Sequence, residues 1–339
     1  MATANISAPQ PNPAFIFETL NAYQRSAALK AAIDLDLFTV IAAGNRTAET
    51  IAQAAAASAR GVRILCDYLV ICNFLLKQGN EYTVTPDAAL FLDRNSQAYM
   101  GSVAGFLLDE RVTAPFRGLA DVVRTGRTTL PGEGTVSHDN PVWVEFARQM
   151  VPLIFPAAAE IAAMLASDGE MRVLDIAAGH GMFGILMAQR SPKAQITALD
   201  WPNVLAVASE NAKRFGVAER HSLLPGDAFE TEFGGPYDVV LVTNFFHHFD
   251  QPTCEKLMRK IRASLTPQGC CATLDFVPND DRVSPPIAAG FAMTMLGTTA
   301  AGDAYTFAEF ETMFRNAGYA SSKQHILQKA PQTVIVSQA

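Results

Sequence analysis

The chain is short of positive charge, of long apolar runs and of cysteines in any metal-binding pattern. Its 339 residues carry 26 lysines and arginines against 33 aspartates and glutamates, a formal net charge of −7. Because a phosphate backbone is held mainly by lysine and arginine, this balance argues against nucleic acid as a partner. No run reaches the roughly 20 apolar residues of a membrane span, and the N-terminal region lacks a basic start followed by an apolar stretch. We therefore expect a cytoplasmic protein without a membrane or nucleic-acid partner.

The five cysteines give no sign of metal or redox chemistry. Their number is odd, their spacing is not that of metal ligands, and most sit in apolar runs where cysteine behaves as a small hydrophobic side chain. We assign no chemistry to them and expect no metal site. They are Cys66, Cys72, Cys254, Cys270 and Cys271.

The length of the chain favours two domains, because 339 residues exceed what one compact core usually holds. Between the two lies a helical region whose last segment, 142–167, is long and apolar. Pro152 and Pro156 are expected to kink it. The expected parts are a flexible tail at 1–14, a first domain at 15–100, a helical linker region contributing to a substrate pocket at 101–168, and a second domain at 169–339.

The first domain has the pattern of a winged helix. Its opening segment, 15–38, is apolar at helical spacing. Thr47 is a candidate helix N-cap, and Arg60-Gly61 is expected to interrupt the helical stretch that follows it. Residues 66–76 are expected to form a second amphipathic helix. Gly79-Asn80 is expected to make the turn of a short hairpin.

A winged helix can bind DNA, so a DNA-binding regulator is the rival interpretation from another functional class. The candidate recognition helix displays mainly Arg60 and Arg63 as cations and is otherwise apolar, whereas a groove-reading helix normally carries several basic and amide side chains. Pairing with a second copy of the chain accounts better for the apolar surface, and predicts a homodimer through the N-terminal helices.

The second domain alternates strands and helices, which predicts an α/β fold with a parallel sheet and right-handed crossovers. A terminal hairpin is expected to close the sheet. Ligands of such sheets bind at the carboxyl ends of the strands. The expected strands are 172–177, 195–200, 221–226, 237–244, 270–277, 325–330 and 332–338, with helices at 181–190, 201–216 and 251–269.

A glycine loop and three acidic residues fall at those strand ends. Asp175, Gly179 and Gly181 lie in VLDIAAGHGMFG, Asp200 ends QITALD, and Asp227 lies in GDAF. This layout suits an adenosine ligand whose ribose and base both need hydrogen-bond acceptors.

The loop also spells G-x-G-x-x-G through Gly184, which by itself would suit NAD as well as S-adenosylmethionine. Two acidic residues favour S-adenosylmethionine. Asp175 could engage the loop or the ammonium group of the ligand, and it would repel a pyrophosphate. Asp227 could accept from an adenine amino group. We therefore expect S-adenosylmethionine as the cofactor.

The motif NFFHHFDQPTC places His247 just beyond the fourth strand, at the edge where a reactive sulfonium would lie. With TAETIAQ, LDIAAGHG, GDAF and YTFAEFETMFRNAGY, this motif makes the chain resemble the plant-type small-molecule O-methyltransferases and their bacterial relatives, such as the caffeic acid and acetylserotonin enzymes. The resemblance covers nearly the whole chain from about Phe15. It implies a Rossmann-like sheet of the class I S-adenosylmethionine methyltransferases, preceded by a winged-helix dimerisation domain.

The resemblance also implies roles for particular residues. His247 and Cys254 keep the spacing of the plant catalytic motif, so His247 matches the general base, with His248 where an acid usually stands and Phe249 where a tryptophan stands. By the same matching, Asp200 would hold the ribose hydroxyls. The remaining cofactor residues that we expect at the strand ends are Trp201, Asp227, Ala228, Phe229, Thr243 and Asn244.

The chain departs from the family pattern at two places. Ala177 replaces the first motif glycine, which narrows the loop. Ala304 stands where the family has an acid that orients the base, so His247 is expected to work alone or with a partner from the helical region, one of Asp109, Glu110 and Arg111. Within the loop, His180 is expected to set loop shape, and an adjacent pair such as His247-His248 is not expected to bind metal because neighbours at a strand end point in opposite directions.

Methyl transfer is an in-line displacement at an activated carbon, so most of the acceleration comes from holding the acceptor in line, and a histidine with a pKa near 6.5 can take the acceptor's proton. We expect O-methylation of a small aromatic or enolic hydroxyl, with C- or N-methylation as alternatives that the fold also allows. The expected acceptor pocket is apolar and aromatic: Phe106, Trp143, Met150, Phe155, Phe246, His248, Phe291 and Met295.

Overall fold

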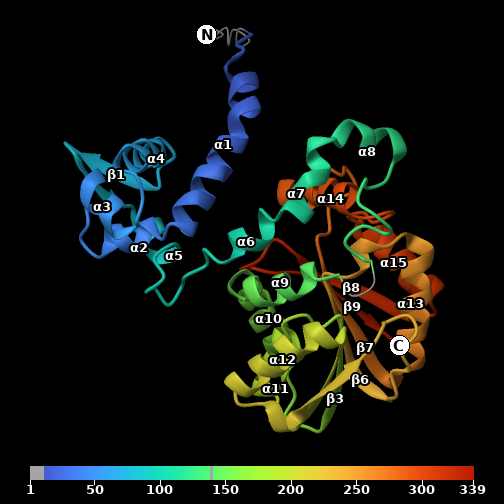
Figure 1. The fold of residues 1–339 in the computed structure, drawn as a ribbon. Helices are drawn as coiled ribbons and strands as arrows, with labels where there is room; N and C mark the ends of the chain where they lie inside the picture. Colours follow the sequence, from blue (N-terminus) through green and yellow to red (C-terminus); the bar gives the residue numbers. More distant parts are fainter. Residues whose placement is uncertain (1–10, 138–139) are drawn as a thin grey trace, which may run out of the picture. The chain divides into compact units, whose positions relative to one another are not determined.

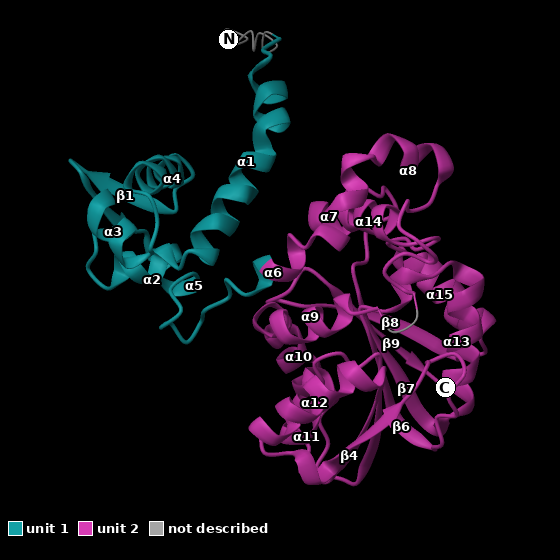
Figure 2. Cartoon of the chain, viewed as in Figure 1, with its two compact units in different colours: residues 1–104 teal, residues 105–339 magenta. Residues whose placement is uncertain are grey.

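The computed structural model describes residues 11–137 and 140–339, so most of the tail expected at 1–14 lies outside the described residues. The chain forms two compact units, residues 1–104 and 105–339 (Figure 2). The helical region that follows residue 104 belongs to the second unit.

The first unit consists of helices and one hairpin. The capping box of Thr47 and Thr50 starts α3 as the sequence predicts, and Gly79-Asn80 connects the two antiparallel strands. Its core includes Phe38 and Leu69, both fully buried. Its elements are α1 (Ala14–Asp34), α2 (Leu37–Ala42), α3 (Ala48–Ala54), α4 (Ala59–Ile71), β1 (Leu75–Gln78), β2 (Glu81–Val84) and α5 (Pro86–Phe91).

The sequence prediction for α4 was wrong at both ends. Ser58 caps this helix by accepting from the backbone N–H of Gly61, so Arg60-Gly61 lies in the first turn and does not interrupt it. The helix ends at Ile71 because Asn73, at φ +63°, turns the chain into the hairpin.

Between the first unit's hairpin region and the large sheet, the described residues form α6 (Val103–Leu107), α7 (Glu110–Arg117), α8 (Leu119–Thr125), α9 (Val142–Gln149) and α10 (Val151–Leu165). Of the two kinks expected in the last segment, the one at Pro152 is confirmed, because α9 and α10 meet at 69° around Met150, whereas α10 continues through Pro156. No single helix of the described part of the chain is long and apolar enough to cross a membrane, although this bent pair reaches that length and composition together. In the fold, α10 packs against α11.

The second unit contains a seven-stranded Rossmann-like sheet in the order β5-β4-β3-β6-β7-β9-β8. The first five strands in that order are parallel, and β8 and β9 form the expected antiparallel hairpin. Its strands are β3 (Met171–Ile176), β4 (Ala194–Asp200), β5 (His221–Pro225), β6 (Tyr237–Thr243), β7 (Leu265–Asp275), β8 (Ser321–Ile326) and β9 (Thr333–Gln338).

Strand β8 begins four residues before the predicted strand at 325–330. In the observed register, Ser321 pairs with Gln338 and Ile326 pairs with Thr333. Residues 327–332 therefore form the connection. This connection contains Pro331, which has no backbone N–H to give to a ladder.

Helices cover both faces of this sheet, with α11 and α12 on one side and α13 and α15 on the other (Figure 1). The predicted helices at α11, α12 and α13 are confirmed, although α13 ends at Ala263 because β7 already begins at Leu265. These elements are α11 (Met182–Arg190), α12 (Pro202–Arg214), α13 (Gln251–Ala263), α14 (Pro286–Thr298) and α15 (Phe307–Asn316), with short 3₁₀ turns η1 (Ala218–Arg220) and η2 (Phe246–His248).

Candidate active site

A cavity of about 500 Å³ opens at the carboxyl ends of the parallel strands in the second unit. The strand ends supply its polar groups, and α9 and α14 supply apolar walls. No lysine or arginine of the described chain lines it. Of the residues predicted for the site, those that line it are Phe106, Trp143, Met150, Gly179, Asp200, Trp201, Asp227, Ala228, Phe229, Thr243, Asn244, His247, His248, Phe291 and Met295.

The glycine loop after β3 turns because three of its residues adopt positive φ. Ala177 has φ +53°, Gly179 +57° and Gly181 +74°, and Gly181 is the N-cap of α11. Gly181 is not among the cavity-lining residues, and a Cβ there would lie 3.0 Å from that of Ala208. Gly181 therefore serves close packing of α11 against α12.

Asp175 lies at the end of β3, under the glycine loop, and binds the backbone of the following helix. Its side chain is completely buried and does not line the cavity, and Oδ2 accepts the backbone N–H of Gly184 at 3.0 Å. Burial raises the pKa of this carboxyl to about 7. The carboxylate thus binds the first turn of α11, just after the glycine loop, and a contact with the ligand stays a prediction.

Asp200 lines the cavity at the end of β4 and ties two loops together. Oδ2 accepts the backbone N–H of Gly179 at 2.8 Å, and Oδ1 accepts that of Trp201 at 2.7 Å. Burial raises the pKa of this carboxyl to about 6. Each oxygen keeps a further lone pair, so the carboxylate can still accept two hydroxyl groups.

Asp227 holds the turn after β5. Its Oδ1 accepts the backbone N–H of Phe229 at 2.7 Å. From α13, Lys260 Nζ donates to the carbonyls of Ala228 at 3.1 Å and Phe229 at 2.9 Å. The turn is thus fixed from both sides, and Phe229 lines the cavity next to Asp227.

His247 and Asp275 form a buried pair. The distance between His247 Nδ1 and Asp275 Oδ1 is 2.6 Å, and the residues are 3% and 1% exposed. Asp275 ends β7 and also accepts the N–H of Phe276 at 2.8 Å. Because the carboxylate accepts from Nδ1–H, the other ring nitrogen keeps its lone pair and can act as a base.

The expected partners of His247 from the helical region are therefore wrong. Asp109 pairs with Arg111, and Glu110 pairs with Arg117, and none of them lines the cavity. The signal for Asp275 was present in the sequence, because the strand CCATLD ends in an acid and β7 pairs in parallel with β6. The carboxyl ends of adjacent parallel strands meet at one edge.

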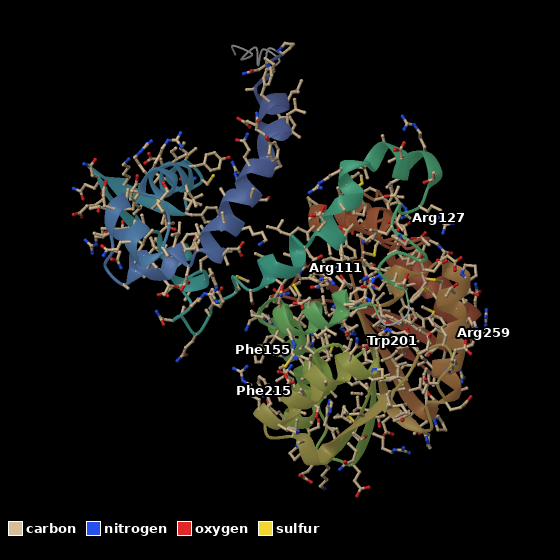
Figure 3. All side chains as sticks on the ribbon, viewed as in Figure 1. Arg111, Arg127, Phe155, Trp201, Phe215 and Arg259 are labelled. Atoms are coloured by element: carbon tan, nitrogen blue, oxygen red, sulfur yellow. The ribbon has the colours of Figure 1, made fainter. Side chains whose placement is uncertain are left out.

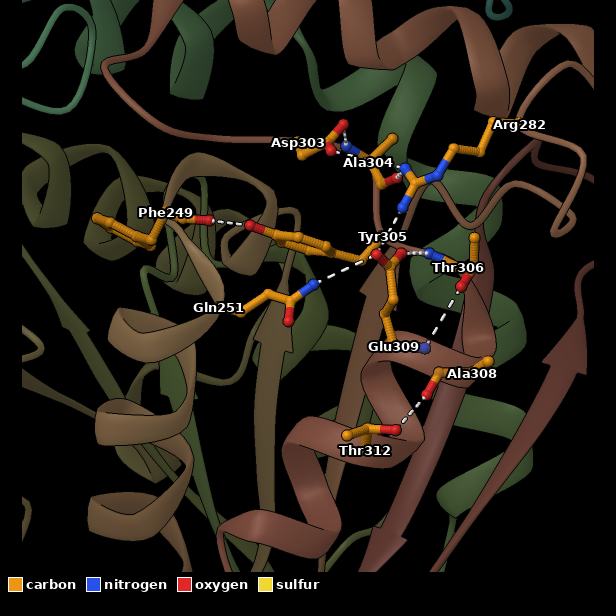
Figure 4. Close-up of polar contacts among 10 residues, drawn as sticks. All are labelled: Phe249, Gln251, Arg282, Asp303, Ala304, Tyr305, Thr306, Ala308, Glu309 and Thr312. Carbon is orange, nitrogen blue, oxygen red and sulfur yellow. Dashed lines mark hydrogen bonds and ion pairs between the residues drawn. The ribbon is translucent and has the colours of Figure 1, made fainter.

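The α14–α15 connection supports the turn that carries His247. Figure 4 shows the contacts of this connection with Phe249 and Arg282. The N–H of Asp303 donates to the His247 carbonyl at 3.0 Å, and the Tyr305 hydroxyl donates to the Phe249 carbonyl at 2.6 Å. Arg282 binds the Ala304 carbonyl and the Glu309 carboxylate. Ala304 thus contributes to the site only through its backbone.

Aromatic rings form a slot in front of His247. Phe291 stacks on Phe276 with centroids 4.0 Å apart and meets the His247 ring edge-on at 4.8 Å. Beside His248, the Trp143 ring lies with its centroid 5.2 Å from the imidazole centroid and donates its indole N–H to the Thr135 carbonyl at 2.8 Å. We call this group of rings the aromatic slot.

Two predicted pocket residues lie elsewhere. Phe246 is completely buried and packs on Phe310 and Phe314 of α15. The 3₁₀ turn has about three residues per turn, so Phe246 points inward while the two following histidines face the cavity. Phe155 is 39% exposed and packs on Phe215, away from the cavity (Figure 3).

A second hollow, of about 620 Å³, lies beside the connection between β7 and α14 and reaches the β8–β9 hairpin. It contains neither the glycine loop nor the histidines. The chemistry is therefore assigned to the cavity at the strand ends.

The polar groups of that cavity fit S-adenosylmethionine. Asp200 and Asp227 offer acceptors to hydroxyl and amino groups, whereas no lysine or arginine of the described lining is present to pair with a pyrophosphate. The carboxylates also suit a ligand that carries a sulfonium and an ammonium charge.

Comparison with known proteins agrees with this fit. Residues 173–269 match the model of a methyltransferase domain, and residues 17–94 match that of an O-methyltransferase dimerisation domain. A solved structure from Nostoc punctiforme, provisionally assigned as an O-methyltransferase, is 49% identical, with a TM-score of 0.95 over 97% of this chain and 100% of that one.

More distant proteins share the same architecture. The tetracenomycin polyketide synthesis 8-O-methyl transferase of Streptomyces glaucescens is 27% identical over 91% of both chains. Human N-acetylserotonin methyltransferase, solved with S-adenosylmethionine, is 19% identical, with a TM-score of 0.82 over 98% of this chain and 99% of that one, and shows the fold alone. The chain belongs to the S-adenosylmethionine-dependent O-methyltransferases that carry an N-terminal dimerisation domain.

Proposed function

We propose that the protein methylates a hydroxyl of an uncharged, flat aromatic or enolic molecule, with His247 as the general base and Asp275 as the residue that orients it. The observation that carries this proposal is the buried pair at 2.6 Å, which opens onto an aromatic slot. The tetracenomycin relative acts, by its name, in polyketide synthesis, and a flat polyketide ring would suit this slot.

When bound, the cofactor supplies a methyl group on a positively charged sulfur. His247 takes the proton of the acceptor hydroxyl while the oxygen–carbon bond forms and the sulfur–carbon bond breaks. The histidine becomes positively charged, and the Asp275 carboxylate beside it stabilises that charge. A phenolate is a far stronger base than an imidazole, so removal of the proton must accompany oxygen–carbon bond formation and not precede it.

The absence of a lysine or arginine from the described lining supports an uncharged acceptor. A carboxylate moved from water into this apolar slot would lose its hydration without gaining a cationic partner from the protein. Phe106, Trp143, Met150, His248, Phe291 and Met295 would contact the ring of the acceptor.

The direct test pairs two acceptors that differ by one carboxylate, 2-naphthol and 3-hydroxy-2-naphthoic acid, and follows methyl transfer by mass spectrometry. We expect methylated naphthol with the methyl on oxygen, a lower kcat/KM for the acid, and loss of both products in His247→Ala. A product with the methyl group on carbon would show that the protein is a C-methyltransferase. A higher kcat/KM for the acid would refute the proposal that the acceptor is uncharged.

We further propose that the protein is a homodimer held together through α1. This helix exposes large apolar side chains that its own unit does not cover. Three of them follow helical spacing along one stripe: Ile16, Leu20 and Tyr23, which are 60%, 66% and 68% exposed. An exposed apolar stripe of this kind marks an interaction site.

A further inference from the structure

The glycine loop carries a buried histidine, His180, with one ring nitrogen that has no partner among the described residues. His180 is 2% exposed and lines the cavity between two glycines. Its two ring nitrogens have different surroundings. Nδ1 accepts the backbone N–H of Met182 at 3.1 Å, whereas Nε2 is buried and has no hydrogen-bond partner among the described residues.

These surroundings define the protonation state of the ring. Burial lowers the pKa of His180 to about 4, so the ring is neutral at physiological pH. A neutral imidazole carries one proton, and a nitrogen that accepts an N–H cannot carry it. The proton therefore lies on Nε2, which leaves an N–H donor without a partner among the described residues, on a ring that lines the cavity.

The ring is also held in place. It stacks on Phe146 with centroids 5.9 Å apart and planes 22° apart, and Phe183 packs at 5.9 Å on another side. The His180 carbonyl accepts from Asn211 Nδ2 at 2.9 Å. A buried donor in a fixed ring requires an acceptor, and none of the described side chains provides one.

The order of the strands indicates which part of the cofactor reaches His180. Strands β5, β4, β3 and β6 lie in sequence across the sheet, so Asp227, Asp200, the glycine loop and His247 follow one another along its edge. With the base of the cofactor at Asp227, the ribose at Asp200 and the methyl group at His247, the amino-acid tail falls at the glycine loop. Its carboxylate carries only acceptors, and no lysine or arginine of the described chain lines the cavity to receive it.

We propose that His180 donates a hydrogen bond from Nε2–H to the carboxylate of the cofactor's amino-acid tail. It is thus a cofactor-specificity residue that recognises the one part of the ligand that the strand-end carboxylates cannot bind. This role rests on the identity of the cofactor and does not depend on which acceptor is methylated.

Calorimetry with two ligands tests the proposal. S-adenosylhomocysteine has the amino-acid tail, and 5′-methylthioadenosine lacks it. In His180→Phe, we expect the Kd of S-adenosylhomocysteine to rise about 10-fold or more, as for loss of a charge-assisted hydrogen bond, while the Kd of 5′-methylthioadenosine changes less than about 2-fold. His221→Phe is the matched control, because His221 is a buried histidine of the same unit that does not line the cavity.

Equal losses for the two ligands, or no loss for either, would overturn the proposal and leave His180 as a loop residue. A second measurement uses the wild-type protein, so that misfolding of the variant cannot hide the answer. Nitrogen-15 NMR of the histidine rings at pH 7 should show His180 protonated at Nε2 only, with the Nε2–H resonance shifting when S-adenosylhomocysteine binds and not when 5′-methylthioadenosine binds. A proton on Nδ1, or the same shift with both ligands, would refute the assignment.

Discussion

Nδ1 of His247 lies 2.6 Å from Oδ1 of Asp275, at the ends of two neighbouring parallel strands. This contact fixes which nitrogen of the histidine is free to act as a base. The second carboxylate oxygen of Asp275 is buried and has no hydrogen-bond partner among the described residues, so the negative charge is available to the imidazolium that forms during the reaction.

The pair leads to the first prediction. Asp275→Asn keeps the shape of the side chain but removes the charge and can hold the wrong ring tautomer, so kcat should fall about a hundredfold to ten-thousandfold. The Kd of S-adenosylhomocysteine should stay within about twofold of wild type, since Asp275 is not a cofactor ligand in our scheme. Steady-state kinetics and calorimetry measure the two quantities.

Asp280→Asn provides the control, because Asp280 is an exposed aspartate five residues further along the chain. It should leave kcat unchanged. Wild-type turnover in Asp275→Asn would show that His247 needs no orienting carboxylate.

The partner of His247 shows where sequence reasoning succeeds and where it fails. Strand ends can be predicted from apolar runs, and this placed Asp200, Asp227 and His247 at one edge. The carboxylate partner could not be predicted from the family resemblance, because the position where the family has an acid is Ala304 in this chain and the partner lies on the neighbouring strand. Asp275 ends β7, whose pairing with β6 already brings it to His247.

The misplaced aromatic residues have a different cause. Phe246 precedes the two histidines in sequence, but the direction of its side chain depends on the 3₁₀ geometry of that turn, which no residue pattern specifies. Phe155 lies on the bent helix pair, and its orientation depends on where the bend falls. The structure places the bend at Met150, so that Met150 faces the cavity and Phe155 does not.

Ala177 provides a prediction about stability. It has φ +53°, a conformation that costs a residue with a Cβ about 1–2 kcal/mol and costs glycine little. Ala177→Gly should therefore raise the free energy of unfolding by up to about 1 kcal/mol, after the larger backbone entropy of glycine is subtracted. Chemical denaturation measures the change.

The neighbouring residue supplies the control. Ala178 is buried and does not have positive φ, so Ala178→Gly should lower the free energy of unfolding by about 0.5–1 kcal/mol or more. Destabilisation by both substitutions to the same extent would show that the loop stores no strain at Ala177.

The raised pKa of Asp200 predicts pH-dependent cofactor binding. Burial raises the pKa of this carboxyl to about 6 in the free protein, and hydroxyl groups that donate to the ionised carboxylate must lower it in the complex. The affinity for the cofactor is therefore highest above pH 6 and falls as the pH drops below 6, because the Asp200 carboxyl must lose its proton before the cofactor binds.

Calorimetry of S-adenosylhomocysteine between pH 5 and 8 tests this dependence. Wild type should lose affinity below about pH 6, and Asp200→Asn should bind weakly with a flat profile across that range. His180, with a pKa of about 4, does not titrate in this window. A variant that keeps the wild-type slope would assign the titration to another group, such as Asp175.

The aromatic slot predicts which phenylalanine controls acceptor binding. Phe291 lies against both Phe276 and His247, so Phe291→Leu should raise the KM of a naphthol acceptor several-fold while leaving the KM of S-adenosylmethionine unchanged. Phe155→Leu removes an aromatic ring that packs on Phe215 outside the cavity, and should change neither constant. An equal KM of the naphthol acceptor in wild type and in Phe291→Leu would exclude Phe291 from the acceptor site.

The apolar stripe on α1 predicts the state of assembly. Replacing Ile16 and Leu20, 60% and 66% exposed, by serine removes apolar area from this stripe without disturbing the core of the first unit. Sedimentation velocity at micromolar concentration should show a dimer for wild type and a monomer for this double variant. Val283 and Ile326, 71% and 76% exposed in the second unit, provide the matched pair for substitution by serine, and that variant should remain dimeric. The proposal assigns the contact between the two copies to the apolar side chains of α1 alone. A wild-type monomer, or a double variant on α1 that remains a dimer, would therefore contradict assembly through this helix.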